Sequence, residues 1–372
     1  ENARKFLDAD EYELLEDFEK NLEKIKDAIT EHGGNKSIVD DMPYVIGLGM
    51  DVVLNLHEEY KAIMDMFEAD NVTYPIKAFF GELLERPRRT KAYPIALINK
   101  NINLDQLLAI NNAMKYPLAY IQGPPGTGKT NTIINTIVTA FFNNVTVLFA
   151  SYNNVPIDNV FEKLSSMKYR GKTIPFPVLR LGNTEKVMEA IKYINELRTQ
   201  VQSLQIFAST LDKRKDDRID RAKRLSARLK EYEEILDLKE RKETLTHLMK
   251  YQEHMKNTMK LLPFQTDLQG YQMQKLDKRI AAIGEISDAD AMQLLDRNED
   301  EFYQYLFYTS ARYIKALEEP KFQELRLILD SDEAPEKLVN EFNKYVSKSE
   351  NIRKLQRVFP IIITTCISAH KI

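Results

Sequence analysis

The chain has 372 residues, a length that predicts roughly two or three domains. It is 43% hydrophobic and 29% charged, which is typical of a soluble globular protein. The formal net charge of −3 excludes a global basic field, so any surface for nucleic acid has to be a local patch. No apolar run approaches the ~20 residues of a membrane span, and no signal-peptide pattern follows Glu1. The single cysteine, Cys366, excludes an internal disulfide framework and predicts an intracellular protein.

Two helices and a connector are expected in the first part of the chain. In residues 1–32, apolar side chains recur at steps of three and four residues, and two consecutive glycines follow as a C-cap, so we predict one long helix. A second helix is predicted over residues 51–67. Residues 70–100 contain three prolines and one glycine, which predict an irregular connector. A mainly helical domain with its connector is therefore expected over residues 1–100.

From residue 101 onward, short apolar runs alternate with segments of helical periodicity. This alternation of strand, helix, strand, helix and strand is typical of a parallel sheet that helices cover on both faces. We assign the first part of this α/β core to residues 101–184. Its predicted helices are residues 105–114, 130–142 and 156–166, and its predicted strands are residues 118–122, 145–150 and 178–181.

The alternation stops after the third strand. Residues 183–262 contain neither glycine nor proline and keep helical spacing, so we predict long helices that form an antiparallel pair, partly like a coiled coil. More helix is predicted over residues 272–349. An apolar strand that begins at Pro360 then returns to the core. A helical insertion over residues 185–350 is therefore expected between two strands of one sheet, with residues 351–372 as the return strand.

Three features of the second half each have two competing interpretations. Residues 212–230 contain nine basic and four acidic residues, which predict either contact with a phosphate backbone or an exposed helix with ion pairs at i,i+4 spacing. The aromatic run of residues 302–313 favours core packing over a base-stacking platform. Cys366 is expected to be a small buried hydrophobic residue rather than a nucleophile.

The string GPPGTGKT at residues 123–130 fits the phosphate-loop pattern G-x-x-x-x-G-K-[ST] and lies between a predicted strand and a predicted helix. Its glycines let backbone N–H groups surround phosphate oxygens, and the following helix points its positive end at the same anion. Lys129 is expected to reach the β- and γ-phosphates, and the Thr130 hydroxyl to be a Mg²⁺ ligand, so these two are the candidate catalytic residues. The loop residues expected to contact nucleotide are Gly123, Pro124, Pro125, Gly126, Thr127, Gly128, Lys129, Thr130 and Asn131.

The loop alone leaves two classes open, because AAA+ ATPases share the string GPPGTGKT. Four surrounding segments, in chain order, are NLDQLLAINNAM, ASYNNVPIDNVFEKL, VLRLGN and TTCISA, and they begin at residues 103, 150, 178 and 364. Together they resemble the superfamily 1B helicases, the group of senataxin and the nonsense-mediated-decay helicase. The resemblance covers residues 101–183 and 357–372. It implies an α/β, RecA-like P-loop NTPase core, incomplete in this chain.

The resemblance also implies ATP and Mg²⁺ as cofactors. Gln106 matches the glutamine of the Q motif, which reads the adenine of ATP, and Asn103 matches the asparagine that opens this motif. An amide suits the role because it both donates and accepts hydrogen bonds, as the adenine edge does.

Motifs Ia and Ic of the family would contact nucleic acid. Motif Ia lines the single-strand path, and motif Ic resembles a set of phosphate contacts made by hydroxyls and backbone amides. The motif Ia string here contains Pro156 where the family usually has alanine. The corresponding residues are Ser151, Asn154 and Asp158 for motif Ia and Thr364, Thr365 and Ser368 for motif Ic.

In this family, the strand after motif Ic carries an Asp-Glu pair for Mg²⁺ and the attacking water, and a second RecA-like domain supplies an arginine finger. The sequence ends at Ile372, before either position. We therefore expect an N-terminal fragment of a helicase that binds ATP-Mg and hydrolyses it inefficiently, since the arginine alone contributes roughly 10³–10⁵ in rate. Two Asp-Glu pairs precede motif Ic. Asp300 with Glu301 reads as solvated charge, and Asp332 with Glu333 follows an apolar run that reads as a helix.

The expected partners are single-stranded DNA or RNA and a second RecA-like domain, and no membrane. Two other classes stay open from the residues alone. One is an AAA+ ATPase or another P-loop switch. The other is a helical interaction scaffold whose phosphate loop only senses nucleotide.

Overall fold

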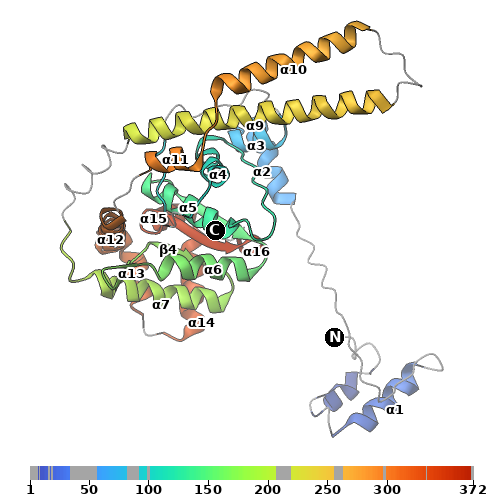
Figure 1. The fold of residues 1–372 in the computed structure, drawn as a ribbon. Helices are drawn as coiled ribbons and strands as arrows, with labels where there is room; N and C mark the ends of the chain where they lie inside the picture. The colour runs from blue at the N-terminus through green and yellow to red at the C-terminus, as the bar shows by residue number, and fades with distance from the viewer. Residues whose placement is uncertain are drawn as a thin grey trace. The chain divides into compact units, whose positions relative to one another are not determined.

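The computed structural model describes residues 7, 9–15, 17, 20–33, 57–81, 92–98, 101–206, 219–254, 263–295, 299–331 and 333–369. The chain divides into two compact units, Glu1–Asn71 and Val72–Ile372 (Figure 1). Within the described ranges, no helix has an apolar stretch long enough to cross a membrane.

The first unit contains two helical segments where the sequence predicts one helix. A 3-10 helix covers Ala9–Leu15 and helix α1 covers Leu22–Gly33, so the predicted C-terminal end at the glycines is confirmed. The side chain of Asn21 donates to the carbonyl of Leu14 at 3.3 Å, which satisfies that carbonyl where the helix is interrupted. Helix α2, His57–Glu68, overlaps the predicted second helix and ends one residue beyond it; the first residues of that prediction lie outside the described part of the chain.

A parallel three-stranded sheet forms the centre of the second unit. Its order is β1 (Val147–Ser151), β5 (Ile361–Thr365) and β4 (Val178–Arg180). Ile361 of the central strand pairs with residues on both neighbours, and the return of the chain to the sheet is thereby confirmed. This helix-rich unit with a parallel sheet core is the architecture expected of a P-loop NTPase.

Successive side chains of β5 point to opposite faces of the sheet, as the period of a strand requires. Ile361 and Ile363 pack into a cluster with α5 (Lys129–Phe142), α6 (Asn154–Ser165) and α12 (Glu299–Lys315). Ile362 packs on the other face, in a cluster built mainly from the helices α7 (Thr184–Val201), α13 (Gln323–Leu329), α14 (Pro335–Val346) and α15 (Ser349–Gln356). Helices therefore cover both faces of the central strand.

The predicted strand over residues 118–122 is not formed. The segment is irregular, and Leu118, Tyr120 and Ile121 are 52%, 87% and 49% exposed. A strand needs a neighbour for its backbone N–H and C=O groups, and no strand in the described ranges pairs with this segment. The edge strand β1 likewise exposes Leu148.

The predicted insertion divides into two parts. Its helices α7 and α13–α15 belong to the layer over the sheet. Helices α9 (Ile219–His254) and α10 (Pro263–Ile283) form an antiparallel pair (Figure 1). Of the two, only α9 lies within residues 183–262, where the pair is predicted, and its partner begins at the proline that directly follows that range. Helix α9 packs against α4 (Leu104–Lys115) and α11 (Asp288–Leu294). The remaining elements are α3 (Tyr74–Phe79), 3-10 turns at Ala316–Glu318 and Pro320–Phe322, and α16 (Cys366–Ala369).

Several predictions for this region can be compared directly with the structure. The aromatic run is in the core, where Phe302 and Tyr305 pack on Phe142. Helix α13 contains the apolar run before Glu333, so that acid follows a helix and not a strand, as its leucine-rich composition indicates. Asp300 pairs with Arg170 at 2.9 Å. Arg170 belongs to an unpredicted hairpin of β2 (Lys168–Tyr169) and β3 (Lys172–Thr173).

Candidate nucleotide and nucleic-acid site

The phosphate loop leads directly into α5, and two of its glycines have left-handed backbone conformations. Gly126 has φ +84° and Gly128 has φ +77°. A Cβ at Gly128 would lie 2.8 Å from Nε2 of Gln106, so a larger residue would displace this amide in addition to straining the backbone. Gly128 is the N-cap of α5, and the helix is 14 residues long. Its first N–H groups and its positive end therefore face the loop.

Lys129 is held at the mouth of the loop by the loop's own carbonyls. Its Nζ donates to the carbonyls of Gly123 at 2.6 Å and Pro124 at 2.8 Å. The Thr127 hydroxyl also donates to the Pro124 carbonyl, at 2.8 Å. Phosphate oxygens are stronger acceptors for an ammonium than neutral carbonyls, so an incoming phosphate can draw Lys129 away from them.

The residues at the loop fit Mg²⁺ only together with a phosphate. Thr130, in the first turn of α5, offers a hydroxyl oxygen of the kind this ion accepts. No group of three or more metal-binding acids, histidines or cysteines occurs in the parts of the chain that the structure describes. Mg²⁺ usually keeps several waters and binds through one or two protein oxygens plus substrate phosphates. Thr130 is therefore the residue that would hold it, and the ion would neutralise phosphate charge.

Gln106 connects helix α4 to the phosphate loop. Its Nε2 donates to the Thr127 carbonyl at 2.7 Å. Its side-chain oxygen accepts from the Asn103 N–H at 3.2 Å, while the Asn103 side chain accepts from the Gln106 N–H at 2.9 Å. This reciprocal pair is a capping box at the start of α4. The amide that is expected to read adenine is thus placed beside the loop, with both of its ends hydrogen-bonded inside the protein.

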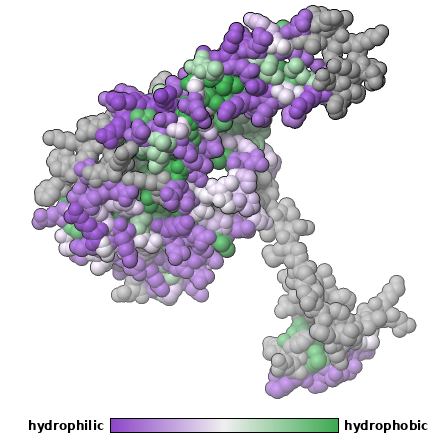
Figure 2. Space-filling view, viewed as in Figure 1, coloured by the Kyte–Doolittle hydropathy of each residue, from purple (hydrophilic) through white to green (hydrophobic). Residues whose placement is uncertain are grey.

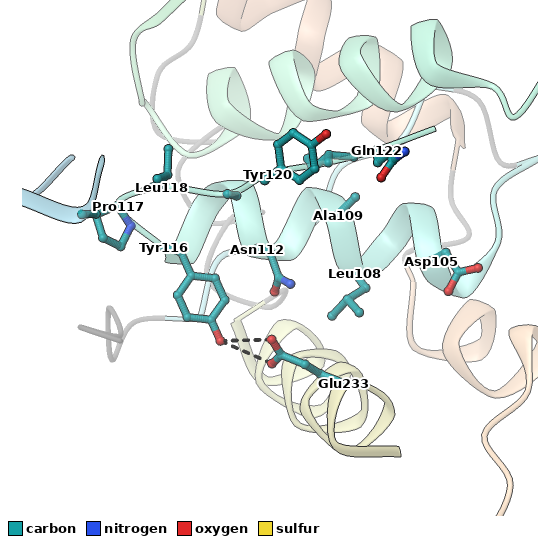
Figure 3. A pocket seen from close by; sticks show the side chains of 13 residues that line it. Asp105, Leu108, Ala109, Asn112, Tyr116, Pro117, Leu118, Tyr120, Gln122 and Glu233 are labelled. Atoms are coloured by element: carbon teal, nitrogen blue, oxygen red, sulfur yellow. Dashed lines mark hydrogen bonds between the residues drawn. The ribbon is translucent and has the colours of Figure 1, made fainter. Parts of the chain in front are cut away.

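A cavity of about 520 Å³ borders the loop on the side of α4 (Figure 3). Residues along α4 form one wall, and the segment that ends at Gln122, immediately before the loop, forms another. Helix α9 lines a further side of the cavity through Glu233, which accepts a hydrogen bond from the Tyr116 hydroxyl at 3.3 Å. Tyr232 on α9 donates to Asp105 at 2.8 Å. Burial, with the Asp105 hydrogen bond, raises the pKa of Tyr232 to about 12, so its hydroxyl stays a donor at neutral pH.

The predicted motif Ia and motif Ic residues meet at the carboxyl ends of β1 and β5. Ser151 and Thr365 are direct partners in the register of these strands. The Thr365 hydroxyl accepts from the Ser368 N–H at 3.3 Å and so caps α16. The hydroxyl of Thr364 is buried inside the core. Of the two threonines of motif Ic, only Thr365 therefore presents its side chain at this edge of the sheet. The expectation that Cys366 is buried is wrong, because it begins α16 at the surface.

A buried arginine holds the start of α6, where the other motif Ia residues lie. Arg180, at the end of β4, has a side chain that is 4% exposed. It donates to Asn154 Oδ1 at 2.7 Å, to Asp158 Oδ1 at 3.1 Å and to the Leu181 carbonyl at 2.6 Å. A Cβ at Gly182 would lie 3.3 Å from its Nη1. The sequence contained one signal for this role, a cation within the otherwise apolar run VLRL, and it was not predicted.

A family model described as an AAA domain matches residues 101–371 of this chain. The chain belongs to this family. The match includes the phosphate loop, the sheet and all the helices that follow α4. It also extends from the phosphate loop to strand β5, which agrees with the single sheet that β1, β4 and β5 build.

Similar proteins carry helicase names or a DNA-binding name. The DNA-binding protein SMUBP-2 of Mus musculus is 34% identical over 101 residues, which are 27% of this chain and 10% of that protein. The DNA polymerase alpha-associated DNA helicase A of Schizosaccharomyces pombe is 32% identical over 98 residues, 26% of this chain and 14% of that protein. An uncharacterized ATP-dependent helicase of Methanocaldococcus jannaschii is 30% identical over 144 residues, 36% and 21% of the two chains.

The chain thus spans about a tenth to a fifth of the length of these relatives. No solved structure matches it. The helicase names among these relatives support a superfamily 1 helicase.

Proposed function

We propose that this chain holds the first RecA-like lobe of an ATP-dependent helicase of superfamily 1B. In this proposal, ATP-Mg binds at residues 123–130, and single-stranded DNA or RNA passes over the carboxyl ends of β1 and β5. The observation that supports it best is the hydrogen bond from Gln106 to the Thr127 carbonyl, because the amide that we propose to read adenine is bonded to the phosphate loop. Ser151 beside Thr365 supports the strand path, since ligands of open α/β sheets bind at the carboxyl ends of strands.

The proposed mechanism is closure of two RecA-like lobes on ATP, which steps the pair along a single strand. The residues of this lobe bind and orient the phosphates, through Lys129 and the first N–H groups of α5. A second RecA-like domain is the proposed partner, and it would supply the arginine that stabilises the transferring phosphoryl group.

The decisive experiment measures the ATPase activity of the natural full-length protein with single-stranded DNA, with single-stranded RNA and with neither. Stimulation by at least one polymer is expected, because the proposed work of the enzyme is coupled to the strand. Unchanged turnover with both polymers would contradict the proposal and favour a P-loop switch or a nucleotide-sensing scaffold.

Gln106 is expected to make the site prefer ATP over GTP. A site built to hydrogen-bond one base edge leaves polar groups unpaired with the other base. The change Gln106→Ala should therefore bring the dissociation constants for ATP and GTP, measured by titration with fluorescent nucleotide analogues, to within about threefold of each other.

The matched control for this change is Asn103→Ala. It removes the same capping box, at about 1 kcal/mol, and leaves the amide of Gln106 in place. The ATP preference should survive in this variant. Equal affinity of the parent for the two nucleotides would argue against adenine recognition by Gln106.

Cys366 offers a direct probe of the strand path, because it is exposed and adjoins Thr365. A bound strand at the ends of β1 and β5 should shield its thiol. We expect iodoacetamide to label Cys366, the single cysteine of residues 1–372, and saturating single-stranded nucleic acid to slow this labelling by at least about tenfold, as a Kd well below the strand concentration requires. Labelling at one rate with and without the strand would place the path elsewhere.

A further inference from the structure

The first three turns of α9 present a basic surface that the nucleotide site does not use. Residues 219–230 contain one acid, Asp220, and five bases. Ala222, Leu225 and Leu229 are buried, and the two leucines pack in the cluster shared with α4 and α11. The bases therefore lie on the exposed sides of the helix, in the hydrophilic surface that Figure 2 shows along α9. They are Arg221, Lys223, Arg224, Arg228 and Lys230.

The charge of α9 reverses directly after this surface. Residues 231–237 contain four acids and no base. Three of these acids have partners within the protein. Glu231 pairs with Arg228 at 2.7 Å, Glu233 accepts from Tyr116, and Glu234 pairs with Arg279 at 2.7 Å. The acidic turns of α9 therefore serve internal contacts.

The basic turns are not neutralised in the same way. Lys223 pairs with Asp220 at 3.4 Å, and Arg228 lies near both Glu231 and Asp290. In the described part of the chain, no acid pairs with Arg224 or Lys230. Both side chains are exposed. Ion pairs along the helix are the alternative interpretation of this run, and they do not neutralise all of its bases. The surface therefore stays positive, in a chain whose net charge is −3.

We propose that this face of α9 binds the phosphate backbone of nucleic acid, as a second contact outside the strand ends of the sheet. The inference rests on the proposed function in one respect, that the protein acts on nucleic acid. At about 1.5 Å per residue, residues 221–230 span roughly 14 Å, a length over which one strand of a duplex presents about four phosphates at an axial rise of ~3.4 Å each. These turns contain no aromatic residue, so the contact is electrostatic and independent of base sequence.

Salt dependence of binding tests the proposal. The double change Arg224→Gln with Lys230→Gln removes two exposed charges from the surface. Its control, Lys239→Gln with Lys250→Gln, removes two exposed charges from the distal part of the same helix. Affinity for labelled single strands is measured in the full-length protein against KCl concentration. The test variant should lose about 1.4 from the slope of log K against log salt, and roughly tenfold in affinity, while the control matches the parent.

The outcomes separate this inference from the proposed function. A parent that binds no nucleic acid would defeat the proposed function and this inference with it. A parent that binds, with a test variant of the same slope, would overturn the α9 contact alone. Equal losses in the test and control variants would also overturn it, because they would report overall charge and not a site. ATP affinity should be unchanged in both variants.

Discussion

Lys129→Ala is expected to lower the affinity for ATP strongly while leaving the protein folded. The Lys129 ammonium is the one loop side chain that brings a positive charge to the phosphates, and hydrogen bonds to charged groups contribute about 1.5–3 kcal/mol. The affinity for ATP should therefore fall by about 10- to 100-fold. The two carbonyls that Lys129 now contacts lie at an exposed loop, so water can replace it there.

Isothermal titration with ATP and Mg²⁺ measures this loss, and thermal unfolding reports the fold. Lys163→Ala on α6 is the matched control, since it removes an exposed lysine from the same unit away from the loop. Its ATP affinity should equal that of the parent. Undiminished ATP binding by Lys129→Ala would refute the assignment of residues 123–130 as the nucleotide site.

Arg180→Met is expected to destabilise the fold and to weaken nucleic-acid binding without affecting ATP. The change leaves Asp158 and Asn154 without the cation that orients them. Breaking a buried pair costs about 3–5 kcal/mol. Because the side chain of Asp158 is 47% exposed, water recovers part of this loss, and we expect about 2–3 kcal/mol. Nucleic-acid affinity should fall further than stability alone explains, because α6 carries the predicted motif Ia contacts.

Arg198→Met is the matched control. Arg198, on α7, also has a mostly buried side chain, 18% exposed, and its acidic partners are Asp330 at 2.6 Å and Glu318 at 3.5 Å, neither of which belongs to α6. It should lose comparable stability, by denaturant unfolding, and keep its nucleic-acid affinity. Arg180→Lys retains the charge but not the planar fork, so it should recover stability only in part. Equal nucleic-acid affinities for Arg180→Met and Arg198→Met at a temperature where both are folded would remove the positioning role.

Local patterns predicted the regular elements well. The phosphate loop and the start of α5 follow from residues 123–130 alone, because glycine adopts the positive φ found at Gly126 and Gly128 without the strain of a side chain. The strand at Ile361 was predicted from its run of buried β-branched residues. The length of α9 follows from the absence of breakers in residues 183–262, but its antiparallel partner α10 lies beyond that range.

The failures depend on neighbours that are distant in sequence. Residues 118–122 have the composition of a strand, but pairing requires an adjacent strand that composition does not report. The hydrogen bonds from Arg180 to Asn154 and Asp158 join three positions that no short sequence pattern connects. The hairpin at Arg170 and Gly171, with φ +48° and +80°, had a signal in its glycine. Cys366 was misplaced because general burial preferences say nothing of a helix that starts at the surface. The site residues and the domain boundaries remain predictions.

The first turn of α4 is hydrogen-bonded both to the phosphate loop and to helix α9. Two consecutive residues leave it in different directions: Gln106 is bonded to the phosphate loop at Thr127, and Asp105 is bonded to Tyr232 of α9. A displacement of the loop on nucleotide binding would therefore pull on the long helical pair. Coupling between two binding sites is reciprocal in free energy. Nucleic acid bound to α9 is therefore expected to change the affinity for ATP, and ATP titrations with and without bound nucleic acid would measure this change.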